Sequence, residues 1–532
     1  MFPILTNTSC NKEHTIIAIS DVIPPYGGYS KFITQGLNDA YLPVWLQEAG
    51  YNTYYLGKFL NYHTTANYDK PFAAGWTSND FLLEPYTYQY YNSSWQKDQD
   101  PPINMPGLYT TDILANKSLE YLEEAHRGSE KGKPFFLTIA PIAPHSNVVY
   151  ADSYLTAFDG NNSGNINPLH STAVVTPPMP AERHKSLFPN ARIPRTPDFN
   201  PDEPSGVSWI SQLPQQNQSN VDYNDEFYRQ RLRSLQAVDE MVDSIVAKLE
   251  TLGILDDTYI VYTTDNGYHI GQHRLQAGKM CGFETDINVP FIIRGPNVPK
   301  NKTTELVTSH TDIGPTFFNM MDIPLRPEFD GSPIPFTESA IHDAQPNRQE
   351  HVNIENWGLA AFEGAHGITQ GSGFFLTSNT YKGARVFGDE FNLYYSVYCS
   401  NERELYDINA DPYQMNNLIP GGNSSIVSAP GSNSMISGYP VNKVMERLDS
   451  LMMVLKTCKA ESCIRPWGVI FPNGNVNSLK DALNPNYDSF FKDAFSQNAV
   501  SFSACVRGQV LDKEGPLTPL IYKRSMELSA LM

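Results

Sequence analysis

Asp265 and Asn266 stand side by side after an apolar run that predicts a strand, and Gly267 follows them. Their side chains offer two hard oxygen ligands of the kind that calcium and magnesium prefer, and the glycine allows a sharp turn that aims both at one point. An ordinary Asp-Asn-Gly turn has the same residues, so the spacing alone leaves that interpretation open. Lys279 follows soon afterwards and would place an ammonium group beside the same ligand. We therefore interpret residues 258–279 as one wall of a metal-dependent site for a small tetrahedral oxyanion.

Two more polar residues come just after predicted strands. Lys58 follows a short strand pattern over residues 52–56, and His145 follows the apolar run 135–140. A lysine at a strand end can bind an anion, and a histidine there can act as a general acid or base. Each residue is also compatible with an ordinary solvated position. Because ligands in an open α/β sheet bind at the C-terminal ends of the strands, we expect both residues to lie near Asp265.

The elements that must position these residues alternate between helical and strand patterns. Helical periodicity covers residues 42–49, 111–125 and 225–252, and strand patterns cover residues 52–56, 135–140, 258–263 and 289–293. The longest helix has one apolar stripe, and Gly253 can cap its C-terminus. Alternation of this kind predicts an α/β fold with a mostly parallel sheet flanked by helices.

The length of the chain, 532 residues, suits two domains of unequal size. A change in composition over residues 333–349 predicts a larger catalytic domain at 1–340 and a smaller C-terminal domain at 341–532. Residues 146–221 are rich in Pro, Asn and Ser and form too long a stretch for an ordinary connection. They predict a folded insertion near the site or a functional loop.

The chain is acidic, with a net charge of -19 and an isoelectric point of about 5.0. Such a balance argues against nucleic acid or an anionic membrane surface as the partner. An anionic ligand would need local Lys, Arg, His or metal to overcome the field of the whole molecule. No apolar run reaches the length of a membrane span.

Sequons and a pair of closely spaced cysteines point to the secretory pathway. N-x-S/T sequons begin at Asn7, Asn92, Asn116, Asn161, Asn217, Asn301 and Asn423. Cys458 and Cys463 bracket a tight loop where a short disulfide would fit. Two free thiols or zinc ligands are the alternatives, and no further Cys/His pair at ligand spacing supports zinc. The N-terminus lacks the basic and apolar parts of a signal peptide, so we expect a secretory protein whose leader is absent from this chain.

Taken in order, the motifs resemble those of the sulfatase family, and most closely those of fungal arylsulfatases. The G-Y-x-T-x-x-x-G-K pattern at residues 50–58 resembles the second sulfatase signature. The D-N-G, G-K and D-I-N-V-P motifs over residues 265–290 resemble the next block of the family. Residues 310–316, Asp330-Gly331 and the L-Y-D to N-N-L segment over 405–418 match later landmarks. The resemblance runs from about Asp21 to near the end of the chain.

This resemblance implies an alkaline-phosphatase-like α/β fold with a smaller α+β C-terminal domain, and calcium-assisted hydrolysis of sulfate esters. Asp265 and Asn266 would be the metal ligands, and His145 would lie near the leaving group. Lys58 and Lys279 would bind the sulfate oxygens, so that a cation and two ammonium groups stabilise the charge on the departing sulfate. The partner would be a small-molecule or carbohydrate sulfate ester, with aryl sulfates as the expected class. The sequence leaves the oligomeric state open.

The family's nucleophile is a formylglycine made from the cysteine of a C-x-P-S-R motif, and this motif does not occur in the sequence. Cys10 is the only cysteine before Cys281, and Asn-Lys-Glu-His follows it. The early strand with paired aspartate ligands is also missing, residues 1–20 resemble nothing in the family, and Leu60 stands where many members have histidine. We therefore assign no nucleophile and expect little or no activity from the chain as written.

An incomplete or mis-spliced N-terminus would explain this loss, and so would a true pseudoenzyme. Two other functions stay open beside arylsulfatase-like hydrolysis. The chain could bind sulfated ligands through Lys58, His145 and Lys279 without turning them over. It could also be a phosphatase or phosphodiesterase of the same superfold, because a fold does not determine the ester.

Overall fold

The computed structural model describes most of the chain. The described residues are 27–129, 131–150, 173–344, 348–358, 360–364, 375–376, 379–419, 434–506 and 508–523. The expectations for residues 1–20, for Cys10 and for the sequons at Asn7, Asn161 and Asn423 lie outside these ranges.

A five-stranded sheet positions the N-terminal part of the site, and its strands follow the order β4-β3-β2-β1-β5. Its strands are β1 (Asn52–Lys58), β2 (Ser78–Leu82), β3 (Asn92–Lys97), β4 (Ile103–Pro106) and β5 (Phe135–Ala140). β1 pairs in parallel with both β2 and β5, whereas β3 and β4 add antiparallel pairs at one edge. The predicted α/β sheet is thus confirmed. Its parallel part includes β1 and β5, the two strands at whose ends Lys58 and His145 were predicted.

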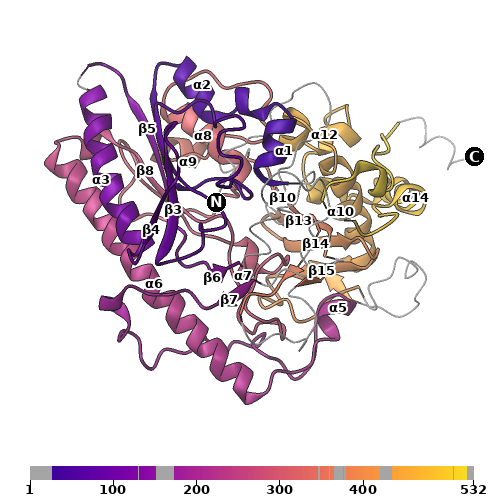
Figure 1. Cartoon of the computed structure of the whole chain (residues 1–532). Helices are drawn as coiled ribbons and strands as arrows, with labels where there is room; N and C mark the ends of the chain where they lie inside the picture. Colours follow the sequence, from indigo (N-terminus) through magenta and orange to yellow (C-terminus); the bar gives the residue numbers. More distant parts are fainter. Residues whose placement is uncertain are drawn as a thin grey trace, which may run out of the picture.

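Different helices cover the two faces of this sheet (Figure 1). On one face, Tyr54 of β1 belongs to an apolar cluster with α3 (Thr110–Ser129) and α6 (Gln218–Thr251). On the opposite face, Tyr55 belongs to a cluster with α1 (Gly28–Thr34). Because successive side chains of a strand point to opposite faces, this alternation explains why β1 is buried on both sides.

The helix ends follow from local residues. α2 (Leu42–Glu48) matches its prediction and ends before Gly50, whose φ of 91° only glycine adopts readily. α6 begins at Gln218, earlier than the expected start near Asp225, because the Asn217 side chain accepts a hydrogen bond from the Asn220 amide at 3.0 Å. The apolar stripe starts only after this polar first part, so periodicity alone missed it.

The strand before the Asp-Asn-Gly turn forms a separate pair. β8 (Ile260–Thr263) pairs antiparallel with β9 (Phe291–Arg294). Among the described residues, neither strand hydrogen-bonds to the five-stranded sheet. The strands expected over 258–263 and 289–293 therefore exist, with slightly different ends. They pair with each other and do not extend the parallel part of the described five-stranded sheet.

The C-terminal part has its own antiparallel sheet and apolar core, as expected for a smaller unit. The sheet order is β10-β13-β14-β15, with β10 (His351–Asn356), β13 (Tyr381–Phe387), β14 (Asn392–Tyr398) and β15 (Arg403–Asp407). α10 (Val441–Leu455) and α14 (Asp488–Asn498) pack into the same core. The domain boundary at 340/341 stays a prediction.

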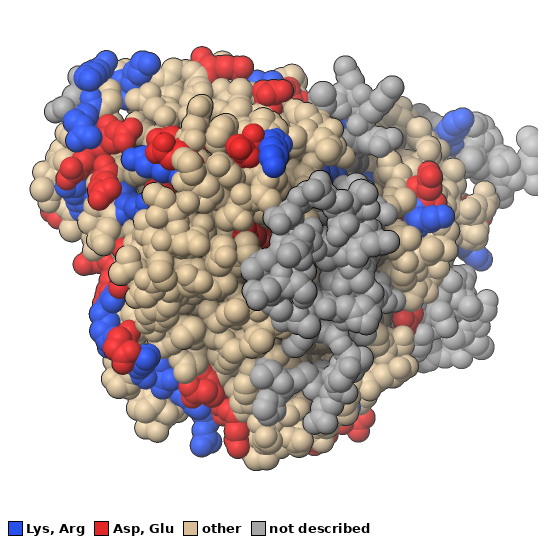
Figure 2. Space-filling model, viewed as in Figure 1, with Lys and Arg blue, Asp and Glu red and all other residues tan. Residues whose placement is uncertain are grey.

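Further short α-helices and strands occur in the described chain. They are β6 (Asn147–Val149), β7 (Val174–Thr176), α5 (Ser208–Ser211), α7 (Glu284–Ile287), α8 (Ile313–Met320), α9 (Glu338–Ala344), β11 (Ala360–Ala361), β12 (Phe375–Leu376), β16 (Met435–Ile436), β17 (Tyr439–Pro440), α11 (Glu461–Ile464), α12 (Trp467–Ile470) and α13 (Leu479–Ala482). β6 pairs with β7, so the described part of the Pro-rich region contains a short two-stranded sheet. Its interpretation as a folded insertion near the site or a functional loop stays a prediction. Figure 2 shows acidic and basic side chains interspersed along the edge of one face, with a broad uncharged area between them.

Two disulfides lie in the C-terminal part. The Cys458–Cys463 bridge confirms the predicted short loop. The Cys399–Cys505 bridge joins residues that are 106 positions apart, a pairing that spacing could not suggest. Within the described ranges, no helix is both long enough and apolar enough to cross a membrane.

Candidate active site

β1 delivers Lys58 as its last residue, two positions beyond the predicted end of the strand. Gly57 has a φ of 98°, and a Cβ atom there would lie 2.2 Å from the Ala140 carbonyl oxygen. Glycine is therefore required where β1 pairs with Ala140 of β5, immediately before the lysine. The Lys58 side chain is buried, and its Nζ lies 4.7 Å from the centre of the Tyr88 ring.

His145 follows β5 and stacks on the same Tyr88 ring, with centroids 4.0 Å apart. Its Nδ1 lies 2.9 Å from the Ser146 carbonyl oxygen. A carbonyl only accepts, so Nδ1 carries the proton of the neutral ring and Nε2 keeps its lone pair. Burial lowers the pKa of His145 to about 3, and Lys279 acts in the same direction. The imidazole is therefore neutral at physiological pH.

A short ladder holds the segment of Lys279. Gly278 forms bridges with His269 on one side and with Phe362 on the other. The next residue along the second chain segment, Glu363, donates its backbone amide to the Ala277 carbonyl at 2.7 Å. This pairing brings residues from beyond 340 against the wall that carries Lys279.

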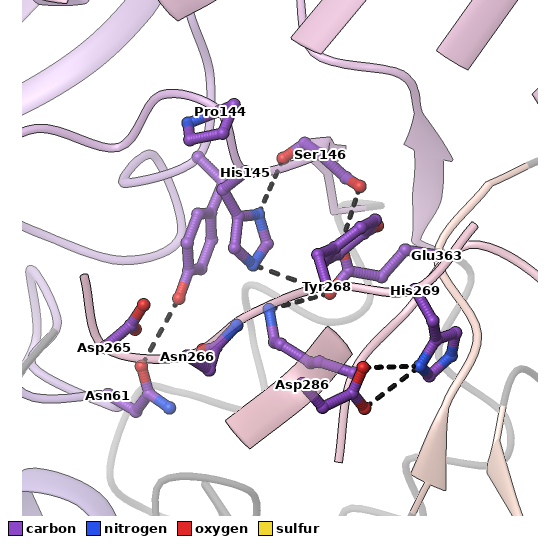
Figure 3. Close-up of polar contacts among 12 residues, drawn as sticks. Asn61, Pro144, His145, Ser146, Asp265, Asn266, Tyr268, His269, Asp286 and Glu363 are labelled. Carbon is purple, nitrogen blue, oxygen red and sulfur yellow. Dashed lines mark hydrogen bonds and ion pairs between the residues drawn. The ribbon is translucent and has the colours of Figure 1, made fainter. Parts of the chain in front are cut away.

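Glu363 is the centre of a polar network that the sequence did not indicate (Figure 3). Its Oε1 accepts a hydrogen bond from Lys279 Nζ at 2.8 Å, and lies 3.9 Å from His145 Nε2. Its Oε2 accepts from Ser146 Oγ at 2.7 Å and from the Tyr268 hydroxyl at 2.9 Å. Burial alone would raise the pKa of Glu363, but Lys279, His145 and the hydrogen bonds hold it well below its usual range.

Asp265 and Asn266 form the turn after β8, and Figure 3 shows them with Asn61. Gly267 is required here because a Cβ atom would lie 2.0 Å from the Thr285 carbonyl oxygen. The Asn266 amide nitrogen donates to the Gly267 carbonyl at 2.6 Å, which leaves the side-chain oxygen as an acceptor. Burial acts to raise the pKa of Asp265, and the charges of Lys58 and Lys279 act to lower it.

Shared contacts bring the expected residues together, because Tyr88 contacts both Lys58 and His145 and Glu363 lies beside both Lys279 and His145. Burial lowers the pKa of Lys58 to about 8, Asp265 and Glu363 oppose that shift, and Lys279 reinforces it. The positive charges of Lys279 and Lys58 also lower the pKa of His145. The structure thus places Lys58, His145, Asp265 and Lys279 near one another, and their roles in a site stay a prediction.

Two contributors were missed by sequence reasoning. Glu363 lies in an Ala-Phe-Glu-Gly stretch that has no motif, and it reaches the site only through tertiary pairing. Tyr88 lies in a tyrosine-rich run over residues 86–91, which reads as ordinary core material. The density of tyrosines was the only signal in the sequence.

A second polar group is formed by residues between His269 and Asp286. One ligand atom each from His269, Cys281 and Asp286 lies within 4.8 Å of the others, and all three residues are buried. Sulfur and nitrogen ligands suit zinc rather than calcium. However, Asp286 already accepts from His269 Nδ1 at 2.9 Å and from the Cys281 amide at 2.8 Å. We interpret this group as a set of structural hydrogen bonds that join the segment after the Asp-Asn-Gly turn to α7.

Comparison with known proteins identifies the class that this fold and site define. Residues 14–323 match the family model described as sulfatase. Sulfatase ppz1 from Metarhizium majus is 40% identical over 443 residues, which cover 83% of this chain and 87% of that protein. The arylsulfatase from Volvox carteri is 35% identical over 89% of this chain and 70% of its own. The chain therefore belongs to the sulfatase family, whose members are sulfuric-ester hydrolases.

A solved structure supports the fold assignment. A Bacteroides thetaiotaomicron protein, described with the metabolism of multiple glycosaminoglycans, matches with a TM-score of 0.50 and 19% identity. The match covers 79% of this chain and 77% of that one. At this identity the likeness concerns the fold, which is the alkaline-phosphatase-like α/β fold that the motifs implied.

Proposed function

We propose that Lys58 and Lys279 bind the sulfate oxygens of an ester, with His145 beside the leaving group. The observation that supports this proposal is that both ammonium groups lie near His145. Lys58 Nζ is 4.7 Å from the centre of the Tyr88 ring that stacks on His145, and Lys279 Nζ is 2.8 Å from the Glu363 oxygen that lies 3.9 Å from His145 Nε2. Asp265 and Glu363 offset part of the repulsion between these two like charges, and an anion bound between the ammonium groups would relieve more of it. A sulfate group with its charge spread over several oxygens suits such a pair.

Asp265 and Asn266 fit the calcium ion that we propose for this site. Their donor atoms are a carboxylate and an amide oxygen, both hard ligands, and Lys58 and Lys279 favour the ionised form of Asp265. A bound calcium ion would supply Lewis-acid stabilisation of charge on a sulfate oxygen. The protein's contribution is to hold both donors in a turn that Gly267 makes possible.

The tautomer of His145 determines how it would handle a proton. Nδ1 is engaged with the Ser146 carbonyl, so Nε2 is the atom that exchanges a proton with the leaving group. An anionic ester beside the ring would raise the low pKa of His145, because it compensates the field of Lys58 and Lys279. The histidine then has both protonation states within reach.

The nucleophile is a separate question from binding. The family resemblance implies a formylglycine from C-x-P-S-R, and that motif does not occur in this sequence. We propose that the chain as given binds sulfate esters and turns them over slowly or not at all. If turnover is absent altogether, the same proposal describes a protein that binds sulfated ligands without catalysis.

Binding and turnover can be tested side by side with 4-nitrophenyl sulfate and 4-nitrophenyl phosphate. Calorimetry should show calcium-dependent binding of the sulfate ester, weakened about thirtyfold, or about 2 kcal/mol, in Lys279→Ala. Release of nitrophenol reports turnover. Preference for the phosphate ester in both assays would favour a phosphatase, and equal binding by Lys279→Ala would refute the assigned anion site.

We also propose that the protein passes through the secretory pathway. Two disulfides support this, because such bonds persist in oxidising compartments. Treatment of protein from its natural source with a deglycosylating enzyme should lower its apparent mass. An unchanged mass together with free thiols would contradict the proposal.

A further inference from the structure

Glu363 places a negative charge inside a site that we assign to an anion. Its side chain is 9% exposed, and its Oε1 lies 2.8 Å from Lys279 Nζ. At that distance the carboxylate competes directly with any oxyanion for the ammonium group. A site selected only for tight anion binding would have no use for such a competitor.

Glu363 is also held so that it cannot easily move away. Ser146 and Tyr268 donate to its second oxygen, and the Phe362–Gly278 bridge holds the backbone. Tyr268 is itself held, because the guanidinium carbon of Arg231 lies 3.8 Å from the centre of its ring. When an anion binds, Lys279 must therefore be shared rather than released.

Charged groups of both signs face this point. Lys58 and Lys279 are positive, the carboxyl groups of Asp265, Glu84 and Glu363 all act on Lys58, and His145 is neutral. Of these three carboxyl groups, Glu363 is the one that hydrogen-bonds Lys279. Removing the charge of Glu363 would therefore leave the Lys279 ammonium group without the carboxylate that it contacts.

We propose that Glu363 is the resident counter-ion of Lys279: it holds the ammonium group in position when no anion is bound, and it weakens the binding of inorganic sulfate so that the product leaves. This inference rests on the proposed function, because it takes the two lysines as the sulfate site. Glu363 is accordingly a positioning residue that acts through Lys279.

The test is the dissociation constant of inorganic sulfate, measured by calorimetry on the full chain. Glu363→Gln keeps the shape of the side chain and removes its charge, so sulfate should bind about tenfold more tightly. Damage to the site can only weaken binding, so tightening is a signature that a merely structural role would not give. Unchanged or weaker binding by folded Glu363→Gln would overturn the inference.

Glu355→Gln is the matched control. Glu355 also pairs with a buried lysine, Lys382, at 3.0 Å, but it does so within the C-terminal part. This variant should bind sulfate as the wild type does. Equal tightening in both variants would show a general effect of net charge and would overturn the assignment to Glu363.

Tyr268→Phe gives a second test with the opposite sign. It removes one donor to Glu363 and leaves the charge, so the carboxylate should hold Lys279 more strongly and sulfate should bind a few-fold more weakly. If Glu363→Gln does not fold, tighter or unchanged binding by Tyr268→Phe overturns the inference. Wild-type protein that binds no sulfate would overturn the proposed function as well, whereas sulfate binding that depends on Lys279 but not on Glu363 would overturn this inference alone.

Discussion

The ammonium group of Lys58 lies 4.7 Å from the centre of the Tyr88 ring. The same ring stacks on His145 at an interplanar angle of 23°. One aromatic side chain thus connects the cation that we assign to sulfate with the imidazole that we assign to the leaving group. Because an aromatic face attracts a desolvated cation, Tyr88 helps Lys58 to remain charged while buried.

Replacing Tyr88 should weaken anion binding through Lys58. Tyr88→Leu removes both the cation–π contact and the stacking on His145, so we expect a loss of about 1 kcal/mol, or about fivefold, in affinity for inorganic sulfate. Tyr88→Phe is the control, because it keeps the ring and loses only a 3.3 Å hydrogen bond to Asn61. An equal loss in both variants would assign the effect to the hydroxyl group instead.

Gly57→Ala should disrupt the delivery of Lys58. A Cβ atom at residue 57 would lie 2.2 Å from the Ala140 carbonyl oxygen, at a φ of 98°. We expect a loss of roughly 3 kcal/mol or more in the free energy of unfolding, measured by urea denaturation. Gly36→Ala is matched in backbone sign, with a φ of 70°, but meets open space. Its smaller loss should report backbone strain alone, and equal losses would show that the contact with β5 has no effect.

Asp265→Asn should lower the affinity for calcium. It removes the one ionised ligand of the proposed pair, so the rise in melting temperature on adding calcium should shrink or disappear. Asp256→Asn is a suitable control, because the Asp256 side chain is 99% exposed. Among the described residues, Asp256 forms an ion pair only with Arg294. A calcium effect that persists in Asp265→Asn would place the metal elsewhere.

Glu404 should make stability depend on pH. It is fully buried in the C-terminal part, and burial raises its pKa from 4.5 to about 7. A carboxyl whose folded pKa is raised contributes stability that is fully present below pH 4.5 and is lost as the pH rises through about 7. The loss is roughly 3 kcal/mol by linkage. Glu404→Gln lacks this titration. As the pH is raised from about 5 to about 8, the melting temperature of the wild type should therefore fall relative to that of Glu404→Gln. A constant difference across that range would contradict the assignment.

The two disulfides should differ in their effect on stability. Cys399–Cys505 closes a loop of 106 positions, whereas Cys458–Cys463 closes one of 5. Because a longer loop restricts the unfolded chain more, replacing the first pair by serine should cost about 2–4 kcal/mol and clearly more than replacing the second. Thermal unfolding of both double variants measures the difference. A larger loss from the short loop would indicate that its local packing dominates.

The residues that follow predicted strands were accessible from the sequence. Lys58, His145, Asp265 and Lys279 each come shortly after an apolar run or within a glycine-bounded turn, and local patterns report such positions well. The helix and strand types were predicted for the same reason. The start of α6 was not, because its first part is capped by Asn217 rather than marked by apolar residues.

Long-range pairings were not accessible. Cys399 meets Cys505, and Glu363 meets Lys279, only after two distant segments have packed together. Neither pairing has a spacing rule, and a lone glutamate in an apolar stretch gives no local signal. The antiparallel pairing of β8 with β9 was missed for a related reason, because strand patterns predict elements but not their partners.

The bridge between Phe362 and Gly278 constrains how the sequence of this protein can evolve. A fragment that stops at residue 340 would present Lys279 with neither the neighbouring backbone segment nor the Glu363 carboxylate that accompanies it. Exchange of the two parts by recombination would therefore separate Lys279 from this carboxylate. Substitutions around residue 363 and around residue 279 are instead expected to arise as compensating pairs.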